Sequence, residues 1–247
     1  MTVRVTGIFR HPIKSHGREA LASVALIAGR TMPYDRLWAV AHEVSMADGS
    51  AWAACRNFTR VAGSPALAAI SAELDQARET LTLRHPARAD LTFRPDEDGA
   101  RLLAWLDGFT PQNRPQPVRL VRGATRGFTD SERGHLTLCN RASHRAVEEK
   151  IGHPLAIERW RGNLWIDGAP AWTENDWIGR EIRLGGAVLK CLARTTRCLA
   201  THANPETGER DAQILPTLDS FGHRDFSVKA EVVQGGTVAL DDTVELL

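Results

Sequence analysis

The amino-acid sequence predicts a mainly β protein with a few helices, an α+β class of fold. Short segments of apolar and β-branched residues, separated by Gly, Pro, Asn and Asp, recur along most of the 247 residues. Helical spacing of apolar residues is found mainly in residues 96–109 and 142–151. With 43% hydrophobic and 25% charged residues, the chain has the composition of one large or two small globular domains.

The N-terminal half reads as a small antiparallel sheet or barrel. Residues 2–10 alternate apolar Val3, Val5 and Phe9 with polar neighbours, the period of a half-buried strand. Further strands are predicted at residues 22–27, 37–42, 67–74, 80–83 and 91–94. Residues 96–109 then predict an amphipathic helix that packs on the barrel.

A proline-rich segment, residues 111–117, predicts a boundary between domains at residues 1–112 and 113–247. Its three prolines lack the backbone donors that a helix interior or a central strand needs. Beyond it, strands are predicted at residues 118–122, 135–138, 164–166, 181–184, 187–192 and 237–240. Residues 142–151 predict a helix, capped by Asn140 or Ser143 and ended by Gly152 and Pro154.

Charge and cysteine content limit the class of function. A net charge of +1 provides no electrostatic footprint for nucleic acid or an anionic membrane, so neither is predicted as a partner. The sequence has no apolar run near the roughly 18 residues that span a bilayer, and no secretion signal, which predicts a cytoplasmic protein. The four cysteines form no CxxC pair and are interpreted as thiols: Cys55, Cys139, Cys191 and Cys198.

Cys198 is the leading candidate for chemistry. It follows a strand-like segment, residues 188–193, and precedes the turn residues Asn204, Pro205 and Gly208. Nearby arginines favour the thiolate, the form of cysteine that attacks electrophiles or binds metal. Local sequence is equally compatible with a small buried apolar residue. Cys191, Cys198 and His202 are also compatible with three ligands of a structural zinc site, although the spacing lacks a CxxC knuckle.

Residues 197–208, reading R-C-L-A-T-H-A-N-P-E-T-G, resemble the R-C-x-x-T-x-x-D-P-x-T-G signature of MOSC-domain proteins. This family includes the mitochondrial amidoxime-reducing component and the YcbX-type reductases, which bind the molybdenum cofactor. Asn204 replaces the usual Asp and supplies no carboxylate, but its side-chain oxygen can still cap the turn. Family-like motifs occur in order at residues 11–15, 29–38, 138–143, 161–163 and 177–179, so the resemblance covers nearly the whole chain.

The resemblance implies an N-terminal MOSC β-barrel domain followed by a MOSC β-barrel domain. It also implies that Cys198 is the catalytic residue and ligates molybdenum. The remaining residues expected to bind the molybdenum cofactor are Lys14, Ser15, Arg36, Asn140, Ala142, Ser143, Arg161, Asn163, Thr196 and Arg197. Lys14, Arg36 and Arg161 are expected to meet the cofactor phosphate, and the start of the 142–151 helix offers unpaired backbone donors. A pyridoxal phosphate association also accompanies this family.

The predicted function is reduction of N-hydroxylated compounds: hydroxylamines, amidoximes and N-hydroxylated bases. The chain has no cysteine set for an iron–sulfur cluster and no glycine-rich dinucleotide motif, and the ferredoxin-like domain of the YcbX type is not expected. Electrons are therefore expected from a separate protein: a ferredoxin, a cytochrome b5-like protein or a flavin reductase. His11 and His16 flank Lys14 and are candidate proton donors. Two alternatives stay open, a non-catalytic carrier of the molybdenum cofactor and a persulfide sulfur carrier that uses Cys198.

Overall fold

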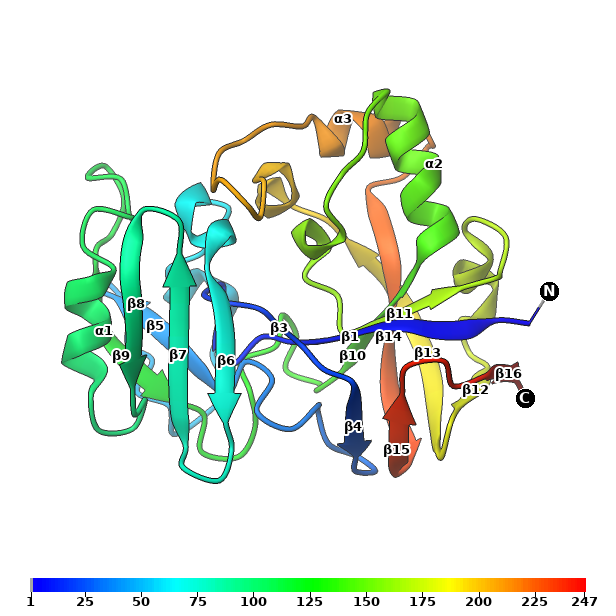
Figure 1. Cartoon of the computed structure of the whole chain (residues 1–247), viewed down its shortest axis with the longest axis horizontal. Helices are drawn as coiled ribbons and strands as arrows, with labels where there is room; N and C mark the ends of the chain where they lie inside the picture. The colour runs from blue at the N-terminus through cyan, green and yellow to red at the C-terminus, as the bar shows by residue number, and fades with distance from the viewer. Residues whose placement is uncertain (1) are drawn as a thin grey trace.

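The computed structural model describes residues 2–247 and has two halves that lie side by side (Figure 1). The N-terminal half contains two three-stranded sheets, in the orders β2-β5-β9 and β6-β7-β8. Their strands are β2 (Ile13–Lys14), β5 (Trp38–His42), β9 (Pro117–Arg122), β6 (Ser71–Asp75), β7 (Thr80–His85) and β8 (Arg88–Phe93). Helix α1 (Gly99–Trp105) contacts β8 and β9. Alternate strand residues such as Leu81 and Leu83 are fully buried between these elements, as the period-two pattern predicts.

The C-terminal half is built on an eight-stranded sheet in the order β16-β12-β13-β14-β10-β11-β1-β3. Its strands are β16 (Val244–Leu246), β12 (Glu181–Leu184), β13 (Ala187–Thr196), β14 (Asp225–Gln234), β10 (Leu136–Asn140), β11 (Leu164–Asp167), β1 (Arg4–Arg10) and β3 (Glu19–Ala20). Helices α2 (Arg141–Ile151) and α3 (Ile214–Asp219) pack together at one end of this half (Figure 1). The prediction of a mainly β fold with few helices is confirmed.

The two halves share strands. β1 pairs with β11 in the large sheet, and β4 (Ser23–Leu26) pairs with β15 (Gly236–Ala239), so early residues of the chain belong to the C-terminal sheets. β9, which was predicted to follow the domain boundary, pairs with β5. The division between residues 112 and 113 stays a prediction. Strand pairs cross it, because β1 and β4 pair with strands of the C-terminal half and β9 pairs with a strand of the N-terminal half.

Helix α2 confirms the predicted cap. The Asn140 side chain accepts a hydrogen bond from the backbone N–H of Ala142 at 2.9 Å, and Gly152 ends the helix with a left-handed φ of 90°. The helix predicted at residues 96–109 is shorter, because only α1 has helical hydrogen bonding. The strand predicted at residues 67–74 starts later, since Pro65 opens a short 3-10 helix that ends at Ala69.

Several elements were not predicted, and the two longest of them are β14 and α3. β14 is ten residues long and lies inside the large sheet, where Phe226, Val228, Ala230 and Val232 are buried in alternation. Helix α3 is short and contains Pro216, which obscures a helical pattern. The remaining short helices are of the 3-10 type: Cys55–Asn57, Pro65–Ala69, Ile157–Trp160, Thr173–Trp177 and Leu199–His202. Within residues 2–247, no helix is both long and apolar enough to cross a bilayer.

Candidate functional site

A cavity of about 300 Å³ lies where the two halves meet. Its size is at the lower end of the range for small-molecule sites. Its polar and charged lining residues include Lys14, Ser15, Arg36, Arg60, Thr129, Asp130, His135, Thr137, Arg159, Arg161, Asn163, Thr195, Thr196, Arg197 and Lys229. Two thiols, Cys55 and Cys198, also line it. The cavity therefore combines a concentration of cations with an exposed thiol.

Most of the residues predicted from the sequence gather in this cavity. They are Lys14, Ser15, Arg36, Arg161, Asn163, Thr196, Arg197 and Cys198. They come from segments that are distant in sequence, and pairing of β1 with β11 and of β2 with β5 brings those segments together. Ser15, Arg36 and Arg161 adopt left-handed φ values of 66°, 54° and 49°. Non-glycine residues in that region are strained, and such strain concentrates at functional sites.

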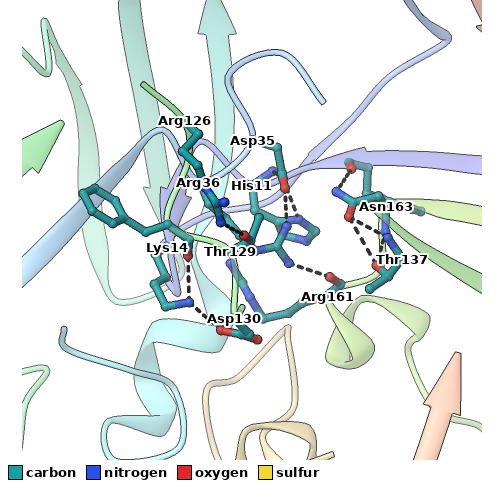
Figure 2. Close-up of polar contacts among 12 residues, drawn as sticks. His11, Lys14, Asp35, Arg36, Arg126, Thr129, Asp130, Thr137, Arg161 and Asn163 are labelled. Atoms are coloured by element: carbon teal, nitrogen blue, oxygen red, sulfur yellow. Dashed lines mark hydrogen bonds and ion pairs between the residues drawn. The ribbon is translucent and has the colours of Figure 1, made fainter. Parts of the chain in front are cut away.

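Lys14 is a buried cation at one side of the cavity. Its Nζ donates to the backbone carbonyl of Phe128 at 2.9 Å and to Asp130 Oδ1 at 2.5 Å (Figure 2). Partial loss of water at the cavity edge raises the pKa of the Asp130 carboxyl, but Lys14, followed by Arg36, outweighs it and holds this pKa well below its usual range. Asp130 is therefore ionised and is the carboxylate that the cavity lining supplies.

Arg36 is oriented by a buried carboxylate. Its guanidinium donates to Asp35 Oδ2 and to the backbone carbonyl of Arg161, the latter at 2.9 Å (Figure 2). Asp35 also accepts from the backbone N–H of His11 at 2.8 Å and contacts His11 Nδ1 at 3.3 Å. Burial raises the pKa of Asp35, yet Arg36 and the His11 hydrogen bonds outweigh it and hold this pKa well below the usual range. A charged Asp35 thus fixes Arg36 at the cavity.

Arg161 is a partly buried cation without a carboxylate partner in the part of the chain that the structure describes. Its guanidinium donates one long hydrogen bond, 3.4 Å, to the backbone carbonyl of Gly17. Burial first, and then the positive charge of Arg36, lower the pKa of Arg161 to about 9, so it stays protonated at neutral pH. A bound anion would offset both effects, because it would supply the missing counter-charge.

Arg197 and Asn163 are held rigidly. Arg197 donates to the carbonyls of Phe226 at 3.0 Å and Trp160 at 2.9 Å, and to Ser227 Oγ at 2.9 Å. Asn163 Oδ1 accepts from the backbone N–H and the hydroxyl of Thr137, both at 3.2 Å, and its Nδ2 donates to the Phe9 carbonyl. These contacts fix the cavity wall next to Cys198.

Cys198 sits at the junction of β13 and a 3-10 helix, and its side chain is exposed to the cavity. Its carbonyl accepts from the backbone N–H of Thr201 at 3.1 Å and from the Thr201 hydroxyl at 3.0 Å. Cys139 and Cys191 are buried, and burial raises their pKa values to about 12 and about 11. They are inert neutral thiols, whereas Cys198 is positioned to react or to bind metal.

Ala200 and Thr201, which follow Cys198, also line the cavity, and a tight turn at residues 204–208 comes after them. Asn204 Oδ1 accepts from the backbone N–H of Glu206 at 2.7 Å, which confirms the predicted turn cap. Arg18 donates to the Pro205 carbonyl at 2.8 Å, and Gly208 has a φ of 76° and packs on Ala66. A Cβ at Gly208 would come within 2.7 Å of Ala66 Cα, so this turn requires glycine.

Asn140, Ala142 and Ser143 do not reach the cavity lining. Asn140 and Ser143 are fully buried and donate to the carboxylate of Glu174, at 2.9 Å and 2.7 Å. The start of α2 is therefore already occupied by the Asn140 cap and by the carboxylate of Glu174. Burial raises the pKa of Glu174, and these hydrogen bonds oppose that shift. The role of these three residues in cofactor binding stays a prediction that the cavity does not support.

The zinc site and the two proton-donating histidines that the sequence suggested are not found in the cavity. In residues 2–247, no three His, Cys, Asp or Glu side chains come together as metal ligands, so the zinc alternative for Cys191, Cys198 and His202 is wrong. His202 Nε2 instead accepts from the backbone N–H of Leu215 at 3.1 Å. His11 and His16 are buried outside the cavity lining. Burial, with Arg161 nearby, lowers their pKa values to about 3 and about 4, so both are neutral.

Several lining residues were missed by the sequence analysis, chiefly Asp130, His135, Thr137 and Lys229. Asp130 and His135 follow a loop rich in glycine and polar residues, which carries no periodic signal. Lys229 lies on β14, the strand that was not predicted. His135 follows a polar loop and begins a predicted strand, and this position was the one feature of the sequence that could have pointed to it.

Comparison with known proteins agrees with these motifs. Residues 2–119 match the model of the MOSC N-terminal beta barrel domain, and residues 126–245 match the MOSC domain. The mouse mitochondrial amidoxime-reducing component 1 is 26% identical over 155 residues, covering 56% of this chain and 45% of that protein. The molybdenum cofactor sulfurase of Anopheles gambiae is 29% identical over 121 residues, covering 44% of this chain and 16% of that protein.

Among solved structures, the YuaD protein of Bacillus subtilis has a TM-score of 0.48 at 14% identity, covering 100% of this chain and 96% of that one. The matched regions span less than half the length of the curated relatives. The two family models together match nearly every residue of the chain, in the order that the sequence motifs predicted. The chain therefore belongs to the MOSC-domain family and consists of a MOSC N-terminal β-barrel domain followed by a MOSC domain.

Proposed function

We propose that this chain is a cytoplasmic oxidoreductase that depends on the molybdenum cofactor and reduces N-hydroxylated compounds. The observation that carries the proposal is that the Cys198 thiol lines the same cavity as Arg161, a partly buried cation with no carboxylate partner among the described residues. The names of the relatives, an amidoxime-reducing component and a molybdenum cofactor sulfurase, support the same chemistry. The pyridoxal phosphate association stays a prediction and is not part of this proposal.

The residues of the cavity fit such a cofactor, a pterin dithiolene that carries a phosphate. Thiolate sulfur is a soft ligand suited to molybdenum, and Cys198 provides it. Lys14, Arg36 and Arg161 provide cations for the phosphate. Two buried polar atoms, Thr195 Oγ1 and Arg159 Nε, have no hydrogen-bond partner in the described chain and belong to lining residues. A polar ligand would supply partners for them.

The chain's own residues then have separate roles. When bound, the cofactor supplies two-electron oxo chemistry. Arg36 and Arg161 hold the phosphate, and Asp35 keeps Arg36 in place. Arg197 is fixed by three hydrogen bonds and supports the backbone from which Cys198 extends. The side chains are oriented before a ligand arrives, which reduces the free-energy cost of binding.

Expression in cells that make the cofactor tests the proposal. We expect about one molybdenum atom per chain, released pterin, and reduction of a hydroxylamine with reduced viologen as donor. NADH or NADPH alone should not support turnover, because the sequence carries no dinucleotide-binding motif. Steady turnover with NADH and this chain alone would contradict the need for a separate electron-transfer protein.

The two alternatives give different results in the same preparation. A carrier would contain the cofactor but would not reduce the hydroxylamine. A persulfide carrier would contain no molybdenum and would release sulfur from Cys198 on reduction, as the exposure of that thiol permits. Metal analysis and turnover therefore separate all three functions.

Changing Arg161 to Ala should weaken retention of the cofactor. A charged hydrogen bond to phosphate contributes roughly 1.5–3 kcal/mol, so the dissociation constant should rise by about tenfold or more. The measurement is the pterin and molybdenum retained after repeated dilution and filtration. Arg78→Ala is the matched control, because the Arg78 side chain is 83% exposed and distant from the cavity lining. Equal retention in Arg161→Ala and the control would exclude Arg161 from the phosphate site.

A further inference from the structure

We propose that His135 delivers a proton to the oxygen that leaves the N-hydroxylated substrate, an inference that rests on the proposed reductase function. His135 directly precedes β10 and lines the same cavity as Cys198. It is the histidine of the cavity lining, and the two histidines suggested by the sequence lie elsewhere. The structure therefore moves the proton donor from the segment around Lys14 to the wall next to Asp130.

The hydrogen bonds of His135 fix its tautomer. Its Nδ1 lies 3.1 Å from the backbone carbonyl of Arg133 and 2.9 Å from Ser131 Oγ. The Ser131 hydroxyl donates its hydrogen to the Arg133 carbonyl at 2.8 Å, so both oxygens near Nδ1 accept from the ring and Nδ1 carries the hydrogen. Nε2 of the neutral ring is then the free basic nitrogen, and it has no protein partner among the described residues. Protonation of the ring therefore places a new N–H on Nε2, at a residue that borders the cavity.

The other titratable groups of the wall are unsuited to this step. Asp130 is ionised through its contact with Lys14 and has no proton to give at neutral pH. Lys14 donates to Asp130 and to the Phe128 carbonyl. Cys198 is assigned to the metal. His135 is the imidazole of the described cavity lining, and its Nε2 can take up and release a proton.

The charges around His135 set the direction of its pKa. Burial is the largest effect and lowers the pKa, and the positive charges of Lys229 on β14 and Arg36 lower it further. The Arg133 carbonyl and the carboxylate of Asp130 oppose this shift. Arg133 itself is ion-paired with Glu231 on β14. The pKa of His135 therefore lies below 6.5, which makes its imidazolium a stronger acid than an unperturbed one.

The overall reaction defines what the histidine must supply. Reduction of R–NH–OH with two electrons and two protons breaks the N–O bond and yields R–NH₂ and water. The electrons come from the external donor. His135 Nε2–H gives one proton to the departing oxygen, and the nitrogen takes the second proton from solvent. Water in the cavity then returns a proton to Nε2, the basic nitrogen of the neutral ring, while Nδ1 keeps its hydrogen throughout.

Turnover of benzamidoxime by the metal-loaded enzyme, with reduced viologen, tests the assignment. His135→Gln should lower kcat by roughly 100-fold, the lower limit of general acid catalysis, with KM changed less than about threefold. Wild-type kcat should fall as pH rises through the pKa of His135, below 6.5, and the variant should lose this dependence. His153→Gln is the control, because His153 is exposed and outside the cavity lining.

The outcomes are distinguishable. A His135→Gln enzyme with wild-type kcat and pH profile would overturn the role of His135 while leaving the reductase function standing. Absence of wild-type turnover in metal-loaded protein would overturn the reductase function and this inference with it. NMR of the full chain gives an independent readout, in which His135 should show the Nδ1–H tautomer and titrate below 6.5. An Nε2–H tautomer would contradict the geometry on which the inference rests.

Discussion

Replacing Cys198 with Ser is expected to reduce turnover of an N-hydroxylated substrate by at least about 100-fold, comparable with the loss of a central catalytic group. A serine hydroxyl does not ionise near neutral pH and is a harder ligand than a thiolate, so it should not hold the metal centre in its active state. The fold should be unaffected, because the Cys198 side chain is exposed and makes no hydrogen bond in the described structure. Initial rates, molybdenum content and thermal unfolding measure the three effects.

Cys55→Ser is the matched control for metal binding. Cys55 is another thiol in the cavity lining, but it lies outside the sequence motif that contains Cys198. It should retain the metal, which would show that the loss depends on one particular thiol. Full activity and normal metal content in Cys198→Ser would refute ligation of the metal by Cys198 while leaving the reductase function standing.

Local patterns predicted the parts of the fold that depend on local energetics. Helix α2 could be placed because Asn140 and Gly152 mark its ends, and caps act within one turn. β14 was missed although Phe226, Val228 and Ala230 alternate correctly, because Lys229, Ala230 and Glu231 are residue types that are depleted in strands. The pairing of β1 with β11 could not be predicted, because it joins residues that are more than 150 positions apart. Such pairing depends on the packing of the whole chain.

In the candidate site, too, local motifs were predictable and contacts between distant segments were not. The motifs located Lys14, Arg36, Arg161 and Cys198, whose side chains the structure brings to one cavity. Asn140 and Ser143 were assigned to the cofactor because a helix N-terminus suits an anion. The sequence could not show that the carboxylate of Glu174, 31 residues after Ser143, already occupies that helix start. Asp130 and His135 were missed because loop residues acquire a function only through their neighbours in space.

The buried carboxylate of Asp35 is expected to be the most sensitive structural position near the site. Asp35 is 1% exposed and is paired with Arg36, and it also accepts hydrogen bonds from His11. Removing one partner of a buried ion pair leaves the other charge uncompensated. Asp35→Ala should therefore lower the free energy of unfolding by about 3–5 kcal/mol at pH 7. Urea unfolding of the wild type and the variant measures the difference.

The difference should also depend on pH, with a sign that the pKa determines. The folded-state pKa of Asp35 lies below its unfolded value, so its stabilisation is present above pH 4 and is lost as pH falls toward the folded pKa. The gap between wild type and Asp35→Ala should thus shrink below about pH 4. Asp90→Ala is the control, since Asp90 is 58% exposed and pairs with Arg84 at the surface, where such pairs contribute about 1 kcal/mol or less. A gap that stayed constant down to pH 2, or an Asp35→Ala protein as stable as the control, would show that Asp35 does not hold Arg36 through its charge.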